Sequence, residues 1–417
     1  MKKYIIIIFL LKSLIIIGQD MEYARNIVEK LSSEKFYGRG YINKGDSIAA
    51  QYLKNEFKNI GLQKIGESYL QKYTFSVNSI PENPVLIFGD NQLAPAKDFI
   101  VIPSSPDIDE WVKICWINKN TFLNPWRFNN FLKSDKSECL VCIDTTGFNN
   151  PELYSFANLF LSKKYIEAKG IIEVATDLKY TARTYIDDIV HIQIKPDVID
   201  VNADSVYLKI SNEFYENYKT QNVVGYLEGE TDSIIMVVAH YDHLGMLGDI
   251  MFPGANDNAS GVSMVLNLAK YYKKNENNLK HNIFFVLFSG EEADLSGSTY
   301  FANNPPFDLS LVKVVINFDM VGTGTHGISV FNAKEYPEYE EILFSLNDEK
   351  KYFERIRTTE AVYSSDHAPF HEKGVKAMFF FAGDNSYYHQ PEDVPEDLTF
   401  KAYKGLFNII IDFIEKM

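Results

Sequence analysis

The sequence has few cysteines and few basic residues for its length. Only three of its 417 residues are cysteine, which is too few for a disulfide scaffold. Lys and Arg total 41 against 56 Asp and Glu, so the formal net charge is −15. This balance argues against nucleic acid as the main partner, because phosphate neutralisation needs an excess of basic side chains. Hydrophobic residues make up 46% of the chain, which is enough to bury a large core.

Long apolar runs are also scarce, and the first one lies at the start of the chain. Residues 1–19 open with Met and two lysines, followed by a short apolar run that Lys12 interrupts. This pattern is typical of a secretory signal peptide, whereas a span of the bilayer needs about 20 apolar residues. We therefore predict an exported protein, periplasmic or secreted after removal of residues 1–19, without stable insertion in the membrane.

The rest of the chain changes character along its length. Residues 20–79 contain two amphipathic segments, 21–32 and 45–60, that we predict as helices. Residues 80–215 contain every tryptophan and cysteine together with short strand-like runs, and we predict that they form an inserted β-rich domain. From residue 216 to 417, apolar runs alternate with helical segments, which is the pattern of a catalytic α/β domain.

Continuous apolar runs in this last part predict strands that are covered on both faces. They lie at 233–239, 282–288, 312–318 and 375–381. Helices are predicted at 261–274 and 400–417. The predicted fold class is therefore α/β, with a mixed, mostly parallel central sheet flanked by helices and a β-rich insertion.

Histidines and carboxylates follow the predicted strands, where ligand sites of open α/β sheets lie. The candidates are His240 and Asp242, Asp257, Glu291 and Glu292, Asp319, and His389. Each one alone has an ordinary structural explanation, such as a helix cap or an exposed acidic loop. Together, two histidines and three carboxylates suit zinc, cobalt or manganese. If Asp257 bridges two ions, each ion has three protein ligands and an open position for water and substrate.

The neighbouring glutamates Glu291 and Glu292 are costly at the end of an apolar strand unless a positive group compensates them. A metal ion would compensate Glu292. Glu291 would then be free to take a proton from water at the metal. Asp242 could hold the second ring nitrogen of His240 and so fix its tautomer.

This ordered set of motifs resembles the dizinc exopeptidase family of bacterial secreted leucyl-type aminopeptidases. Glutamate carboxypeptidase II and the glutaminyl cyclases are more distant relatives. The matching stretches are GRG (38–40), IAAQYL (48–53), AHYDHLG (239–245), PGANDNASG (253–261), FSGEE (288–292), LSGS (295–298), NFDMVG (317–322), SSDHAPF (364–370) and YHQPEDV (388–394).

The resemblance implies a role for each matching residue. The implied zinc ligands are His240 with Asp319, Glu292 with His389, and Asp257 as the bridge. Glu291 is implied as general base, Tyr388 as stabiliser of the oxyanion, and Asp242 as support behind the ligands. Asp366 lies in a loop that lines the pocket in relatives, and residues 80–215 resemble the protease-associated insert of some relatives.

The function implied is that of a secreted zinc-dependent metallopeptidase, an aminopeptidase that hydrolyses N-terminal residues of peptides with water activated by two zinc ions. Co²⁺ or Mn²⁺ are possible substitutes. One alternative is a glutaminyl cyclase-type acyltransferase, although such cyclases typically have Trp where this chain has Tyr388. The other is a non-catalytic binding protein on the same fold, although such proteins usually lose ligands that are all present here.

Overall fold

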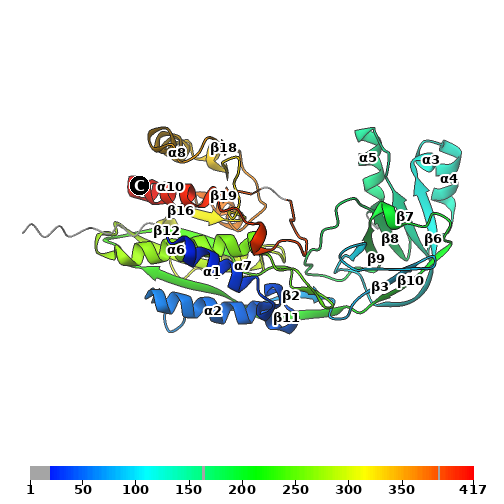
Figure 1. Ribbon diagram of the computed structural model, residues 1–417, viewed down its shortest axis with the longest axis horizontal. Coiled ribbons are helices and arrows are strands. Elements are labelled where there is room, and N and C mark those ends of the chain that lie inside the picture. Colours follow the sequence, from blue (N-terminus) through cyan, green and yellow to red (C-terminus); the bar gives the residue numbers. More distant parts are fainter. Residues whose placement is uncertain (1–18, 162–164, 384–385) are drawn as a thin grey trace, which may run out of the picture.

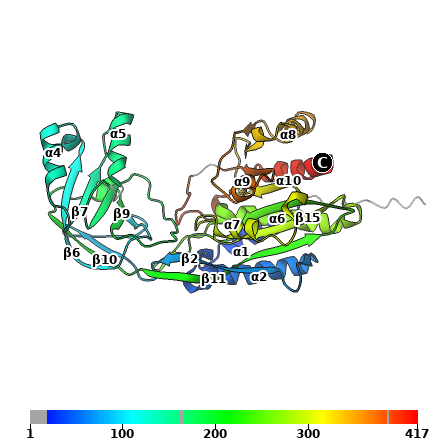
Figure 2. The same ribbon diagram turned by 180° about the vertical axis from the view of Figure 1, so that it is seen from behind.

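The computed structural model describes residues 19–161, 165–383 and 386–417, which form two lobes, each built on a sheet (Figure 1). The same two lobes are seen from behind in Figure 2. The predicted signal peptide lies outside the described residues, apart from Gln19. In the described part of the chain, no helix has the length and apolar character that crossing a membrane requires.

The larger lobe contains a nine-stranded sheet with parallel strands at its centre. In spatial order the central strands are β15 (His281–Phe288), β12 (Thr231–His240), β16 (Val312–Phe318) and β19 (Ala377–Phe381). The outer strands are β1 (Gln63–Lys64), β2 (Leu70–Ser79), β11 (Glu213–Leu227), β17 (Ile328–Phe331) and β18 (Ile356–Thr358). Strands β11 and β17 join the central group antiparallel, one at each side.

Helices cover both faces of this sheet, so that alternate residues of its strands enter two cores. One core contains Val237 and Phe285, and the other contains Met236 and Val286. The first face is covered by α1 (Met21–Leu31), α2 (Gly45–Ile60), α6 (Gly261–Lys274), α8 (Pro337–Lys350) and α10 (Tyr403–Lys416). The second is covered by α7 (Ser296–Asn303) and α9 (Ala368–Glu372). The predicted α/β fold class is confirmed.

The smaller lobe contains an eight-stranded sheet built from residues 85–210. In spatial order its strands are β4 (Asn91–Leu93), β3 (Val85–Phe88), β10 (Ser205–Ile210), β6 (Ile108–Asn118), β7 (Cys139–Asp144), β8 (Gly170–Val174), β9 (Val190–Ile194) and β5 (Phe99–Val101). One face is covered by α3 (Lys119–Phe122), α4 (Pro125–Lys133) and α5 (Pro151–Asn158). The other face packs against Leu244, Leu247 and Phe252 of the larger lobe.

Strand β12 marks the point where the order of the larger sheet reverses. The chain leaves β12, passes through α6 to β15 on one side, and then through α7 to β16 on the other side. Ligands of open α/β sheets bind outside the carboxyl ends of strands at such a switch point. The last residue of β12 is His240.

Candidate metal centre

The side chains predicted as metal ligands meet at this edge of the larger sheet. His240 ends β12, and Asp319 directly follows β16. Glu292 lies in the loop after β15, and His389 lies in the loop after β19. Asp257 lies in the turn Ala255–Ser260 that leads into α6. Parallel strands bring their carboxyl ends to one edge, which is why residues up to 149 positions apart in the chain converge.

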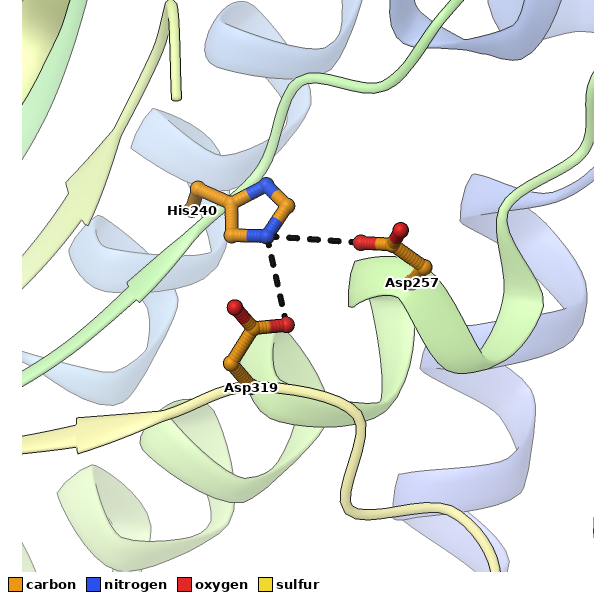
Figure 3. A group of neighbouring side chains, drawn as sticks. All are labelled: His240, Asp257 and Asp319. Atoms are coloured by element: carbon orange, nitrogen blue, oxygen red, sulfur yellow. Dashed lines mark hydrogen bonds and ion pairs between the residues drawn. The ribbon is translucent and has the colours of Figure 1, made fainter. Parts of the chain in front are cut away.

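One group of ligand atoms forms around the imidazole of His240 (Figure 3). His240 Nε2 lies 3.4 Å from Asp319 Oδ1 and 3.4 Å from Asp257 Oδ1. All three residues are buried. Figure 3 shows the two carboxylates directed at the same ring nitrogen from two different elements.

A second group forms on the other oxygen of the same aspartate. His389 Nε2 lies 3.0 Å from Glu292 Oε2 and 3.5 Å from Asp257 Oδ2. Asp257 therefore directs Oδ1 at His240 and Oδ2 at His389, which is the arrangement that a bridging carboxylate needs.

The spacing of these atoms fits zinc. Bonds of about 2.0–2.1 Å in a tetrahedral site place neighbouring ligand atoms about 3.3 Å apart. The distances within both groups lie close to this value, and the donor atoms are the imidazole nitrogens and carboxylate oxygens that zinc accepts. The residues present can therefore hold the metal at both places.

The remaining oxygens of Asp319 and Glu292 each accept a hydrogen bond. Ser365 Oγ donates to Asp319 Oδ2 at 2.8 Å. His243 Nδ1 lies 2.6 Å from Glu292 Oε1. Neither donor was predicted from the sequence, although His243 is three residues from His240 in AHYDHLG and Ser365 is part of SSDHAPF.

Two further buried residues fix the turn that carries Asp257. The carboxylate of Asp393 accepts the backbone N–H groups of Asn256 and Asp257 at 2.8 and 3.0 Å. The guanidinium of Arg39, which is fully buried, donates to the carbonyls of Pro253 and Gly254 at 2.7 Å. Their motifs GRG and YHQPEDV were recognised, but their contacts depend on tertiary packing that a sequence does not display.

Asp242 connects His240 with the loop that carries the two glutamates. Its backbone carbonyl lies 3.2 Å from His240 Nδ1, whereas its carboxylate is 3.8 Å from that nitrogen. The carboxylate accepts the backbone N–H of Glu291 at 3.2 Å and the hydroxyl of Tyr41 at 3.0 Å. The main chain of Asp242 therefore orients the imidazole, while its side chain orients the glutamate loop.

Glu291 and Glu292 are neighbours with opposite electrostatic surroundings. Burial raises the pKa of Glu291 well above its usual range, and the carboxylates of Asp319 and Glu292 add to this effect against His240. Burial also acts to raise the pKa of Glu292, but the imidazoles of His389 and His243 outweigh it and hold that pKa well below its usual range. Glu291 Oε2 lies 3.8 Å from His240 Nε2, beside the first group.

Tyr388 lies against His389, whereas Asp366 is close enough to His240 for their charges to interact. The Tyr388 ring stacks on His389 with the ring centroids 3.7 Å apart. It lines a cavity of about 270 Å³ together with Met320, the neighbour of Asp319. Asp366 is fully buried two residues before α9, and burial raises its pKa to about 7.

A segment of the smaller lobe, residues 177–184, contacts the loops of both Glu292 and His389. The backbone N–H of Tyr180 donates to the carbonyl of His389 at 3.2 Å. Asp177 Oδ1 accepts from the side chain of Gln390 at 2.6 Å. Thr184 donates to Asp294 Oδ2, also at 2.6 Å. The smaller lobe therefore forms one side of the centre.

The chain is similar in sequence to known peptidases. Residues 222–414 match the model described as peptidase family M28. Aminopeptidase YwaD of Bacillus subtilis is 31% identical over 198 residues, which are 44% of this chain and 42% of that protein. A probable leucine aminopeptidase of Trichophyton verrucosum is 26% identical over 228 residues, 49% of this chain and 58% of that protein. The chain thus spans about half the length of these curated relatives.

Solved structures share the fold over nearly the whole chain. BSAP, a zinc aminopeptidase from Bacillus subtilis, superposes with a TM-score of 0.72 and 20% identity over 96% of this chain and 95% of that one. A peptidase M28 precursor from Shewanella amazonensis superposes with a TM-score of 0.68 and 17% identity over 95% and 96% of the two chains. At this level of identity, the likeness establishes the fold.

Proposed function

Because residues 222–414 match the model of peptidase family M28, we propose that this chain is a zinc-dependent metallopeptidase, an aminopeptidase that removes N-terminal residues from peptides. The observation that carries this proposal is the pair of ligand groups that share Asp257, with the carboxylate of Glu291 beside them. The names of the related proteins, which are aminopeptidases, support the same activity.

The proposed centre holds two zinc ions per chain, for which Co²⁺ or Mn²⁺ could substitute. His240 and Asp319 would hold one ion, Glu292 and His389 would hold the other, and Asp257 would contribute an oxygen to each. Zinc held there would supply Lewis-acid chemistry, which lowers the pKa of bound water and polarises a carbonyl oxygen. The carboxylates of Asp257, Asp319 and Glu292 would offset most of the positive charge of the two ions.

The side chains around the ligands perform the proton transfers. Glu291 takes a proton from the attacking water and passes it to the leaving amine. The hydrogen bond from the backbone N–H of Glu291 to the carboxylate of Asp242 keeps the side chain of Glu291 beside the centre. The hydroxyl of Tyr388 donates a hydrogen bond to the oxyanion that develops on the scissile carbonyl. The cavity between Met320 and Tyr388 receives the side chain of the first substrate residue.

The proposal includes export and an inserted domain. Residues 1–19 act as a signal peptide, and residues 80–215 form a domain inserted into the catalytic unit. Terminal sequencing of protein secreted by its host should find a chain that begins near residue 20. Intact Met1 on protein from the cytoplasm contradicts export.

Incubation with peptides that carry free or blocked ends tests the activity. We expect mass spectrometry to show stepwise loss of residues from free amino termini, whereas acetylated peptides stay intact and amidated ones are trimmed. Trimming from the carboxyl end overturns the proposed polarity.

Elemental analysis should find about two zinc ions per chain, and Asp257→Ala should lose more metal than any other ligand variant, because both ions lose a partner.

A further inference from the structure

We propose that His243 is a positioning residue for the metal centre, which holds the oxygen of Glu292 that does not face the metal. This inference rests on the proposed function and extends it to a residue outside the ligand set. The imidazole Nδ1–H of His243 donates to Glu292 Oε1, and Glu292 Oε2 is thereby directed at His389.

His243, Asp257 and Glu292 have ligand atoms within 4.8 Å of one another, but the individual distances favour His243 as a hydrogen-bond donor over a further ligand. His243 Nδ1 lies 2.6 Å from Glu292 Oε1, which is shorter than the separation of about 3.3 Å between two ligands of one tetrahedral zinc. It lies 3.9 Å from Asp257 Oδ2, which is longer than the 3.5 Å between His389 and the same oxygen. His243 therefore contacts one oxygen of Glu292 closely and lies farther from the bridge.

The second ring nitrogen of His243 indicates which tautomer is present. His243 Nε2 is buried and has no hydrogen-bond partner among the described residues. A hydrogen on Nε2 would be a buried donor without an acceptor, which costs free energy. A ring nitrogen without a hydrogen is a buried acceptor without a donor, and its cost is smaller. The hydrogen therefore belongs on Nδ1, where Glu292 accepts it.

The ring is held in place by the backbone around it. His243 is fully buried, and its backbone N–H donates to the carbonyl of Arg39 at 3.4 Å. Gly254 has φ +59°, and a Cβ on it would lie 2.4 Å from His243 Cδ2. The missing side chain of Gly254 thus creates the space that the imidazole fills.

The other ligand group has the same arrangement of one oxygen toward a ligand and one toward a hydrogen-bond donor. Asp319 directs Oδ1 at His240 while Ser365 holds Oδ2, and Ser365 in turn accepts a hydrogen bond from Asn317. Asp319 and Glu292 therefore each have one oxygen directed at the metal site and one that accepts a hydrogen bond. Partners of this kind that fix a ligand typically contribute 10–100-fold to metal affinity.

A pair of substitutions at His243 tests the role. His243→Leu fills the space without a donor, whereas His243→Asn keeps an N–H close to the position of Nδ1. Zinc titration against a competing chelator should show that the leucine variant binds the weaker of its two ions 10–100-fold less tightly than the native protein. The asparagine variant should stay within about threefold of the native affinity, because donation to Glu292 is retained.

A double-mutant cycle shows whether His243 acts through Glu292. In the Glu292→Ala background, which leaves His243 no side-chain oxygen at residue 292 to hold, His243→Leu should cause no further loss of affinity for the zinc that remains bound. Ser365→Ala is the matched control, since it should weaken zinc binding equally in the presence and absence of His243.

Three results overturn the inference. The first is a zinc affinity of the leucine variant equal to that of the native protein. The second is a loss of zinc affinity in the asparagine variant as large as in the leucine variant, because the imidazole ring would then itself be a ligand. The third is a full additional loss in the Glu292→Ala background. A native protein that binds no zinc contradicts the proposed function instead, so the two failures are distinguishable.

Discussion

At the scale of single residues, the centre gives chemically identical groups different tasks. Glu291 and Glu292 are adjacent, yet Glu292 lies between two imidazoles and Glu291 lies near the carboxylates of Asp319 and Asp366. Their separate surroundings explain how one carboxylate can bind metal while its neighbour handles a proton.

Substitution of each glutamate by glutamine should separate these tasks. Glu291→Gln should lower kcat by about 10²–10⁴-fold and keep the metal content, because only proton transfer is lost. Glu292→Gln should lose metal and thermal stability as well as activity, since metal stabilises the native state. The checks are steady-state kinetics, elemental analysis and thermal melts. Loss of metal from the Glu291 variant alone would reverse the assignment.

At the scale of elements, the sequence predicted the buried parts of the larger lobe most accurately. The helices Gly45–Ile60 and Gly261–Lys274 and the strand Val312–Phe318 have the predicted bounds, because their apolar patterns reflect burial directly. Helix α8 was missed, since its residues are mostly polar and only three are buried. The donors His243 and Ser365 were missed because their partners lie 49 and 46 residues away.

The turn before α6 should tolerate no side chain at residue 254. An alanine Cβ there would lie 2.2 Å from the carbonyl oxygen of Asp257 and 2.4 Å from His243. Gly66→Ala is the control, because Gly66 has φ +57° with nothing within 4 Å of the added Cβ. Urea unfolding should show a cost of about 1–2 kcal/mol for the control, due to the left-handed backbone alone. Gly254→Ala should cost about 1–3 kcal/mol more, from overpacking, and equal costs would contradict this account.

His367, the residue before α9, should make the stability of the protein sensitive to acid. Burial lowers the pKa of His367 to about 4, and its Nε2 lies 3.0 Å from the carbonyl of Val362. In the unfolded chain the pKa is about 6.5, so the unfolded state binds more protons between pH 6.5 and pH 4. The stability that neutral His367 contributes is therefore present above pH 6.5 and lost as the pH falls toward 4.

His367→Gln measures this contribution, since glutamine places an N–H near the position of Nε2. From pH 7.5 to pH 5, chelated native protein should lose about 2 kcal/mol more unfolding free energy than the variant. Chelation removes the effect of metal release at low pH from both proteins. Parallel pH profiles of the two proteins would show that His367 is not the sensitive group.

At the scale of the whole molecule, the centre belongs to both lobes. The segment 177–184 bonds to Gln390, next to His389, and to Asp294, two residues after Glu292. The double variant Asp177→Ala, Thr184→Val removes both side-chain bonds. Each bond contributes about 0.5–1.5 kcal/mol, so we expect about a tenfold lower kcat/KM when neither loop is held in place.

Tyr207→Phe is the control for this variant. It removes the hydrogen bond of 2.6 Å from Tyr207 to Asp109, which joins two strands of the smaller sheet away from the centre. Kinetics of this variant should match those of the native protein. Equal activity of the native protein and the double variant would show that the segment contacts the loops without affecting catalysis.

The paired strands β2 and β11 have a consequence for the history of such a molecule. The chain leaves the larger lobe along β2 and returns along β11, and Ser79 pairs directly with Glu213. Figures 1 and 2 show these strands running together between the lobes. A segment whose two ends are neighbours can be gained, lost or exchanged by gene rearrangement without moving the strands beside it. The larger lobe would then keep its architecture, while the residues that border its centre would change in a single event.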